Sequence, residues 1–133
     1  MTNETAGIYC RLSQDDGNAG ESGSIQTQKT LLTQYCEEHH IEIGDYYCDD
    51  GWSGTNFDRP DFKRMLDDIE AEKINMVIVK DLSRFGREYA QMGMYIEHYF
   101  EEKGVRFISV AENIDSNNGV DNMIMPFTNV MNS

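Results

Sequence analysis

Short apolar stretches alternate with helix-like patterns along most of the chain. Residues 6–12, 41–48 and 105–110 are rich in apolar, β-branched or aromatic residues and predict strands. Residues 76–79 are apolar without interruption, which is typical of a strand covered on both faces. Ile114 is placed in a further, short edge strand. The chain therefore has four main predicted strands and one minor one.

Three helices are predicted between these strands. The first follows a capping serine, Ser22 or Ser24, and runs to about residue 40. The second begins at Pro60 with Asp58 as its candidate cap, and the third ends at Gly104. Their core-side positions at helical spacing are Leu31, Leu32, Tyr35, Cys36 and His39, then Phe62, Met65, Leu66 and Ile69, then Met92, Tyr95, Ile96, Tyr99 and Lys103.

This order of elements predicts a three-layer α/β fold, with a central, mostly parallel sheet of four to five strands flanked by helices. The segments 14–23 and 52–59 are predicted loops, and 80–87 is a predicted polar turn. In such sheets chemistry collects beyond the carboxyl ends of the strands. Residues 115–133 are interpreted as a turn at 117–119 and the opening of another helix, with Met123, Phe127 and Val130 at helical spacing.

The amino-acid composition is that of an ordinary globular protein. The chain has 133 residues, enough for one domain, and 39% hydrophobic residues. No apolar run approaches the ~20 residues of a membrane span, and residues 1–5 do not have the pattern of a signal peptide. A cytoplasmic location without a membrane partner is expected. The cysteines, Cys10, Cys36 and Cys48, have no metal-site spacing and are expected to be free thiols, buried for the most part.

Charge argues against nucleic acid at first sight. Eleven Lys+Arg residues against 24 Asp+Glu residues give a net charge of −13, which repels DNA. Much of the acid, however, lies on predicted helix faces. Four arginines instead lie next to predicted strand ends or turns: Arg11, Arg59, Arg84 and Arg87. A local basic cluster on an acidic body fits this distribution, with most of the affinity for DNA coming from elsewhere.

The end of the first strand carries a candidate reactive pair. Residues two apart in a strand point to one side, so Tyr9, Arg11 and Ser13 share a face. A guanidinium can neutralise phosphate oxygens while a serine hydroxyl attacks the phosphorus. The alternative is a serine that caps a turn beside an arginine paired with an acid.

Other polar segments lie at comparable places. Arg84 and Arg87 are three residues apart in the run 80–87, where a solvated basic turn is the alternative. The loop with Gly51 and Gly54 can present Arg59, and Gln28 lies in the first turn of the first helix, where capping explains it equally well. No phosphate-binding glycine loop is present, and Asp49-Asp50 lacks a third carboxylate, so no metal or cofactor is expected.

Together and in this order, these segments resemble the resolvase/invertase family of serine site-specific recombinases, most closely the large serine recombinases or transposon-type resolvases. The resemblance runs from about residue 6 to the end. Its motifs are Tyr-x-Arg-x-Ser at 9–13, Ser-Ile-x-x-Gln at 24–28, Gly-x-Ser-Gly near 51–54, Asp-Arg-Pro at 58–60 and Lys-Asp-Leu-Ser-Arg-Phe-Gly-Arg at 80–87.

The resemblance implies DNA transesterification without metal or nucleotide. Ser13 would displace a 3′-hydroxyl and form a 5′-phosphoseryl bond to DNA, and strands would be exchanged within a tetramer. The residues that would bind and stabilise the scissile phosphate are Arg11, Arg84 and Arg87. Those that would assist at the DNA phosphate are Arg59, Gln28, Tyr9 and Ser83. DNA and further copies of the chain are the implied partners.

Two departures from the family pattern qualify this expectation. Ser83 stands where many smaller members carry Asp. The sequence also stops at Ser133, where relatives continue with a helix that adds an active-site arginine and a dimer interface, followed by DNA-binding domains. Residues 1–133 are therefore expected to be a catalytic domain cut before those parts and inactive by itself. Tyr, Met and Phe residues of 88–103 and 123–131, expected to be exposed, suggest self-association.

Two other functions remain open on the sequence. One is a non-enzymatic flavodoxin-like or receiver-like module, which Asp49-Asp50 and Lys80 would suit. A receiver, however, has its acidic pair after the first strand, where this chain has Arg11 and Ser13. The other is an oligomerisation domain without a working site.

Overall fold

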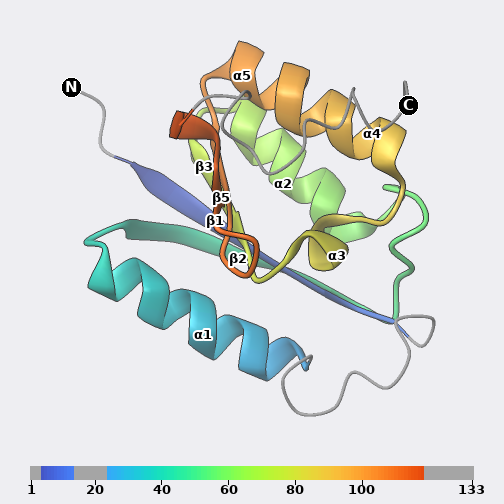
Figure 1. Cartoon of the computed structure of the whole chain (residues 1–133), viewed down its shortest axis with the longest axis horizontal. Coiled ribbons are helices and arrows are strands. Elements are labelled where there is room, and N and C mark those ends of the chain that lie inside the picture. The colour runs from blue at the N-terminus through green and yellow to red at the C-terminus, as the bar shows by residue number, and fades with distance from the viewer. Residues whose placement is uncertain (1–3, 14–23, 119–133) are drawn as a thin grey trace.

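Five strands form one sheet in the order β2-β1-β3-β4-β5 (Figure 1). The structure is a computed structural model that describes residues 4–13 and 24–118. The strands are β1 (Thr5–Leu12), β2 (Glu42–Asp50), β3 (Met76–Val79), β4 (Arg106–Ser109) and β5 (Ile114–Asp115). The first four are parallel, and β5 runs antiparallel to β4. This confirms the predicted mostly parallel sheet and its short edge strand.

Helices cover both faces of the sheet, as Figure 1 shows. Helix α1 (Ile25–Glu38) lies on one face. On the other face lie α2 (Pro60–Glu70) and a continuous helix made of α4 (Tyr89–Gly93), the π-helical turn η3 (Met94–Tyr99) and α5 (Phe100–Lys103). Gly104 ends this helix with φ +71°, as predicted. The three-layer α/β fold is therefore confirmed.

The alternation of side chains along β1 divides the core in two. Ile8 and Cys10 pack in the cluster under α1, whereas Tyr9 packs in the aromatic cluster under α2 and the 89–103 helix. Arg11, two residues after Tyr9, points to the same side as Tyr9. Strand geometry thus directs Arg11 to the side of the sheet where the loop 51–59 and the segment after β3 lie.

The predicted cap of α2 is wrong. The N-cap is Arg59 rather than Asp58, and Asp58 forms an ion pair with Lys63. The first amides of α2 are instead satisfied from the sheet, because the Asp49 carboxylate accepts hydrogen bonds from the backbone N–H groups of Asp61 (2.9 Å) and Phe62 (3.0 Å). A carboxylate distant in sequence thus replaces the local cap.

Two other boundaries differ from expectation. β2 continues through Asp50, because Asp49 and Asp50 pair with the end of β1. The predicted turn 80–87 contains a short helix, α3 (Leu82–Phe85), which Asp81 caps by accepting a hydrogen bond from Arg84 N (3.1 Å). Ser24 caps α1, and Ser22 lies outside the described residues. The chain ends its described part in a 3₁₀ turn, η4 (Ser116–Asn118).

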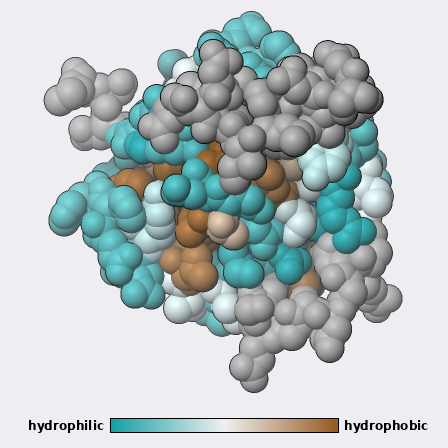
Figure 2. All heavy atoms as spheres, viewed as in Figure 1, coloured by the Kyte–Doolittle hydropathy of each residue, from teal (hydrophilic) through white to brown (hydrophobic). Residues whose placement is uncertain are grey.

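Hydrophobic and hydrophilic residues are unevenly distributed over the surface. In the view of Figure 2, hydrophobic residues gather toward the middle of this face and hydrophilic residues cover its outer parts. No helix in the described part of the chain is long and apolar enough to cross a membrane. Tyr89 and Met94 are exposed as predicted, but Phe100 is fully buried, because it faces Phe85 and Phe107 in the core. The expected apolar surface at 123–131 lies outside the described residues.

Candidate active site

The end of β1 brings a guanidinium to a serine hydroxyl. Arg11 Nη1 donates a hydrogen bond to Ser13 Oγ over 3.3 Å. Arg11 is fully buried, whereas Ser13 is only partly buried and lies directly after the last residue of β1. The predicted juxtaposition of these two side chains is present at the carboxyl edge of the sheet.

Arg11 is held from two other segments. Its Nη1 donates to the Trp52 carbonyl (2.9 Å) and its Nη2 to the Ser83 carbonyl (2.5 Å). The loop 51–59 approaches so closely that a Cβ on Gly54 would lie 2.7 Å from Arg11 Nη2. A side chain at position 54 would therefore displace the Arg11 guanidinium from its place, where carbonyl groups 41 and 72 residues further along the chain hold it.

Gln28 fixes the backbone of the same residue. Its side-chain amide accepts from Arg11 N (3.2 Å) and donates to Arg11 O (3.1 Å). Gln28 is itself fully buried in the first turn of α1. The structure thus places this predicted residue against the strand that carries Arg11, rather than at the hydroxyl of Ser13.

The segment after β3 brings Arg84 to the same edge. Arg84 is 7% exposed, and its Nη1 donates to the Arg11 carbonyl over 3.3 Å. Asp81 lies 4.0 Å from Arg84 Nε. The Asp81 carboxylate also accepts a hydrogen bond from the Ser83 hydroxyl (2.5 Å), so that it contacts both Ser83 and Arg84.

Arg87 joins the cluster through its backbone. Arg87 N donates to the Gly54 carbonyl (2.7 Å), and a Cβ on Gly54 would lie 3.1 Å from Arg87 Cγ. Arg87 is exposed, unlike Arg11 and Arg84. The loop 51–59 therefore contacts two of the three arginines that the sequence assigned to the phosphate.

Arg59 lies elsewhere, in a buried network on the inner side of the loop. It is fully buried, and its guanidinium donates to the Tyr9 hydroxyl (2.7 Å), the Asn56 carbonyl (2.9 Å) and the Phe85 carbonyl (2.8 Å). The Phe57 ring lies 4.6 Å from its Cζ atom. Desolvation lowers the pKa of Arg59 from its ordinary value. None of these contacts is with Ser13.

Tyr9 and Asp49 complete this network. The Tyr9 hydroxyl donates to Asp49 Oδ2 over 2.7 Å, and the same carboxylate caps α2. Burial raises the pKa of Tyr9 well above its ordinary value, and the hydrogen bond to Asp49 adds to this rise against the opposing charge of Arg59. Asp49 is thus engaged in structure, which removes the main reason to interpret Asp49-Asp50 as a receiver-like acidic pair.

Two kinds of group that hold the site residues in place were not predicted from the sequence. Asp81 was not assigned a role, although an Asp directly before a helix is a common N-cap. The carbonyl groups of Trp52, Ser83 and Phe85 also hold guanidiniums, and no side-chain pattern reveals such backbone partners.

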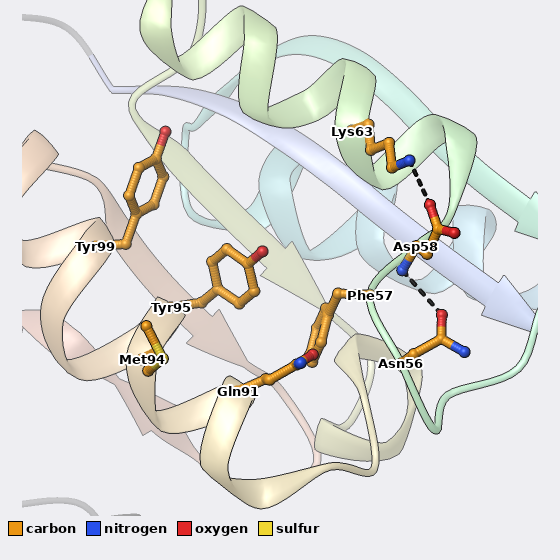
Figure 3. A pocket seen from close by; sticks show the side chains of 8 residues that line it. All are labelled: Asn56, Phe57, Asp58, Lys63, Gln91, Met94, Tyr95 and Tyr99. Carbon is orange, nitrogen blue, oxygen red and sulfur yellow. Dashed lines mark hydrogen bonds and ion pairs between the residues drawn. The ribbon is translucent and has the colours of Figure 1, made fainter.

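A separate apolar pocket of about 470 Å³ lies between the loop 51–59 and the 89–103 helix. Figure 3 shows Tyr95 and Gln91 extending from the helix toward Phe57 on the loop, with the Asp58–Lys63 ion pair on the α2 side. None of the predicted site residues lines this pocket. The candidate active site is therefore the edge around Ser13 and not this hollow.

Similar folds occur in solved structures of recombinases. The N-terminal catalytic domain of TP901-1 integrase matches 97% of this chain and 94% of its own length, with 28% identity and a TM-score of 0.83. A resolvase family site-specific recombinase from Streptococcus pneumoniae matches 98% of this chain and 87% of its own length, with 29% identity and a TM-score of 0.78. The fold is that of the serine recombinase catalytic domain.

The family is established by the sequence as well. A family model described as "Resolvase, N terminal domain" matches residues 6–133, and the chain belongs to this family. The "uncharacterized immunity region protein 3" of Bacillus phage phi105 is 36% identical over 69 residues, which is 52% of this chain and 83% of that protein. These likenesses confirm site-specific DNA recombination as the function of this catalytic domain.

Proposed function

We propose that Ser13 is the nucleophile of the recombination reaction and that the reaction passes through a 5′-phosphoserine bond. The Ser13 oxygen attacks the scissile phosphorus, the bond from phosphorus to the 3′ oxygen breaks, and that oxygen leaves as a 3′-hydroxyl. The observation that carries this proposal is the Arg11 guanidinium 3.3 Å from Ser13 Oγ at the carboxyl end of β1. A fixed positive charge beside the attacking oxygen favours the added negative charge of the transition state.

Arg11, Arg84 and Arg87 are the proposed phosphate ligands. Arg84 lies against the Arg11 backbone, and Arg87 is tied to the loop that covers Arg11. Guanidiniums that bind one phosphate together can supply charge stabilisation of the kind that metal ions give in other phosphoryl transfers. Energy of the cleaved bond is kept in the phosphoserine ester, so rejoining requires no nucleotide.

The other predicted residues act through these three in our proposal. Gln28 and the Ser83 carbonyl hold Arg11 in place. Tyr9 and Arg59 fix the loop and α3 from inside, so they are positioning residues rather than phosphate ligands. Asp81, two residues before Ser83, supplies the carboxylate at this turn that many smaller relatives carry at the position of Ser83.

DNA and further copies of the chain are the proposed partners. The net charge of −13 disfavours binding of DNA along the whole surface. Contact of this domain with DNA is therefore expected to be local, at the group of arginines that holds the phosphate. The exposed side chains of Tyr89 and Met94 are candidates for contacts between copies. Strand exchange needs at least two cleaved duplexes in one assembly, in keeping with the tetramer expected from the family resemblance.

A covalent trapping assay tests the nucleophile. The full-length protein, with the downstream parts that the family resemblance implies, is incubated with a nicked duplex that carries its crossover site, and the adduct is resolved on a denaturing gel. The unchanged protein should give an adduct and Ser13→Ala should give none, whereas Ser24→Ala, a matched change at the α1 cap, should still give one. Arg11→Lys should lower the rate by about a hundredfold, as expected when one oriented donor to a transition state is lost. An adduct with Ser13→Ala would refute the proposal.

A further inference from the structure

Two thiols lie side by side across β1 and β2. Cys10 and Cys48 are register partners in these parallel strands and belong to the cluster on the α1 face of the sheet. Neighbouring strands lie about 4.8 Å apart. This falls within the Cα separation of about 4.4–6.8 Å that a disulfide spans. The sheet therefore sets these two cysteines at bonding range, and both are free thiols here.

The two thiols differ in access and in charge. Cys10 is fully buried, whereas Cys48 is partly exposed. The pKa of Cys48 is lowered to about 7, chiefly by the hydrogen bond from Cys10 and also by the Lys29 ammonium, against the opposing effects of burial and of the Asp61 and Asp49 carboxylates. The same pairing, together with burial, raises the pKa of Cys10. Cys48 is thus the thiol of the pair that ionises more readily, and Cys10 is the one that keeps its proton.

Cys36 serves as the internal comparison. It lies in α1, is buried, and burial raises its pKa to about 11. It packs in the same cluster as Cys10, but it lies on a helix and is not paired with another cysteine as Cys10 is with Cys48. If all buried cysteines of the protein were sensitive to oxidation, Cys36 would be oxidised too. If only the Cys10–Cys48 pair is sensitive, Cys36 stays reduced.

We propose that Cys10 and Cys48 form a redox-active dithiol, a modification site that hydroperoxides oxidise to a disulfide. The Cys48 sulfur attacks one peroxide oxygen and the O–O bond breaks, giving a sulfenic acid and, from hydrogen peroxide, one water. The Cys10 sulfur then attacks the Cys48 sulfur. The S–O bond breaks, the S–S bond forms, and the departing oxygen takes the Cys10 proton to leave as a second water. The two thiols lose two electrons, and the peroxide gains them.

The position of the pair links it to the proposed active site. Cys10 directly precedes Arg11, and Cys48 directly precedes Asp49, which caps α2. A covalent bond between these positions would join β1 and β2 beside the residues that hold Ser13. The chemistry of the pair is independent of the proposed function and can be tested without DNA.

The first test is the rate at which each thiol of the unchanged, folded chain reacts with iodoacetamide, followed by mass spectrometry. Cys48 should react at least about tenfold faster than Cys36, because the thiolate is the reacting form. Equal rates for Cys36 and Cys48 would overturn the proposal. This measurement needs no variant and so does not depend on how a substitution folds.

The second test is oxidation with hydrogen peroxide. Trypsin places Cys10 in the peptide that ends at Arg11, but leaves Cys36 and Cys48 together in the peptide 30–63, because trypsin does not cut the bond between Arg59 and Pro60. The Cys36→Ser variant therefore makes the assignment unique. We expect the peptides 1–11 and 30–63 to become joined, with the loss of two hydrogen atoms, and to separate on reduction.

Two matched variants define the order of events. Cys10→Ser should stop at a sulfenic acid on Cys48 that a cyclic diketone traps, and Cys48→Ser should leave Cys10 unmodified. Thermal melting of each reduced variant verifies its fold. A disulfide that requires Cys36, or Cys48 oxidised to sulfinic acid in the unchanged protein without a bond to Cys10, would refute the proposal.

Discussion

Arg11 and Arg59 are both fully buried arginines of the family motifs, yet they lie in different regions. Arg11 belongs to the edge region, where its guanidinium reaches the Ser13 hydroxyl as well as the carbonyl groups of Trp52 and Ser83. Arg59 belongs to the inner region, where it contacts the Tyr9 hydroxyl and the carbonyl groups of Asn56 and Phe85. Burial therefore does not distinguish the arginine beside the proposed nucleophile from the arginine in the inner network. The groups that each guanidinium contacts do distinguish the two arginines.

The largest effect on stability is expected at Arg59. Arg59→Lys keeps the positive charge but cannot reach three separate acceptors, so buried carbonyl groups lose their donors. We expect the free energy of unfolding in urea to fall by about 3 kcal/mol. Lys63→Met, at an ion pair whose side chains are 62% and 78% exposed, is the control and should change it by less than about 0.5 kcal/mol. An Arg59→Lys protein of unchanged stability that no longer forms the DNA adduct would instead make Arg59 a phosphate ligand.

A pair of glycine substitutions separates the two regions directly. A Cβ on Gly86 would overlap the Phe57 ring of the inner region, so Gly86→Ala should lower the free energy of unfolding by about 2 kcal/mol. A Cβ on Gly54 meets the end of the Arg11 side chain, which can move away. Gly54→Ala should therefore lower stability by less than about 1 kcal/mol while reducing adduct formation strongly. Equal losses of stability from both changes would show that the edge and the inner region form one unit.

The smallest effect concerns the Tyr9 hydroxyl and is seen in the pH dependence. Because the pKa of Tyr9 is raised in the folded state, the folded protein holds this proton more tightly than the unfolded chain does. Its contribution to stability is complete below pH about 10 and decreases as the pH rises above that value. Tyr9→Phe should cost about 1 kcal/mol at pH 7. Between pH 9 and 11, urea unfolding should show a shallower loss of stability for Tyr9→Phe than for the unchanged protein, and parallel curves would exclude this role.

Much of the fold could be predicted from the sequence, because strand and helix periodicities are local. The alternation along β1 was sufficient to put Tyr9, Arg11 and Ser13 on one side of the sheet. The inner position of Arg59 could not be predicted, since it depends on the Phe85 carbonyl 26 residues later. The cap of α2 was missed for the same reason, because Asp49 reaches it from the neighbouring strand. Contacts between side chains and backbone groups that are distant in the sequence produce no recognisable pattern of residue spacing.

The most direct test of the central claim is to locate the DNA on the protein. After trapping on the nicked duplex and digestion with nuclease, trypsin releases the peptide 12–29, which contains Ser13 together with Ser22 and Ser24. Fragmentation of this peptide should place the nucleotide remnant on Ser13 alone. A remnant on Ser22, on Ser24 or outside this peptide would contradict the assignment of Ser13 as the nucleophile.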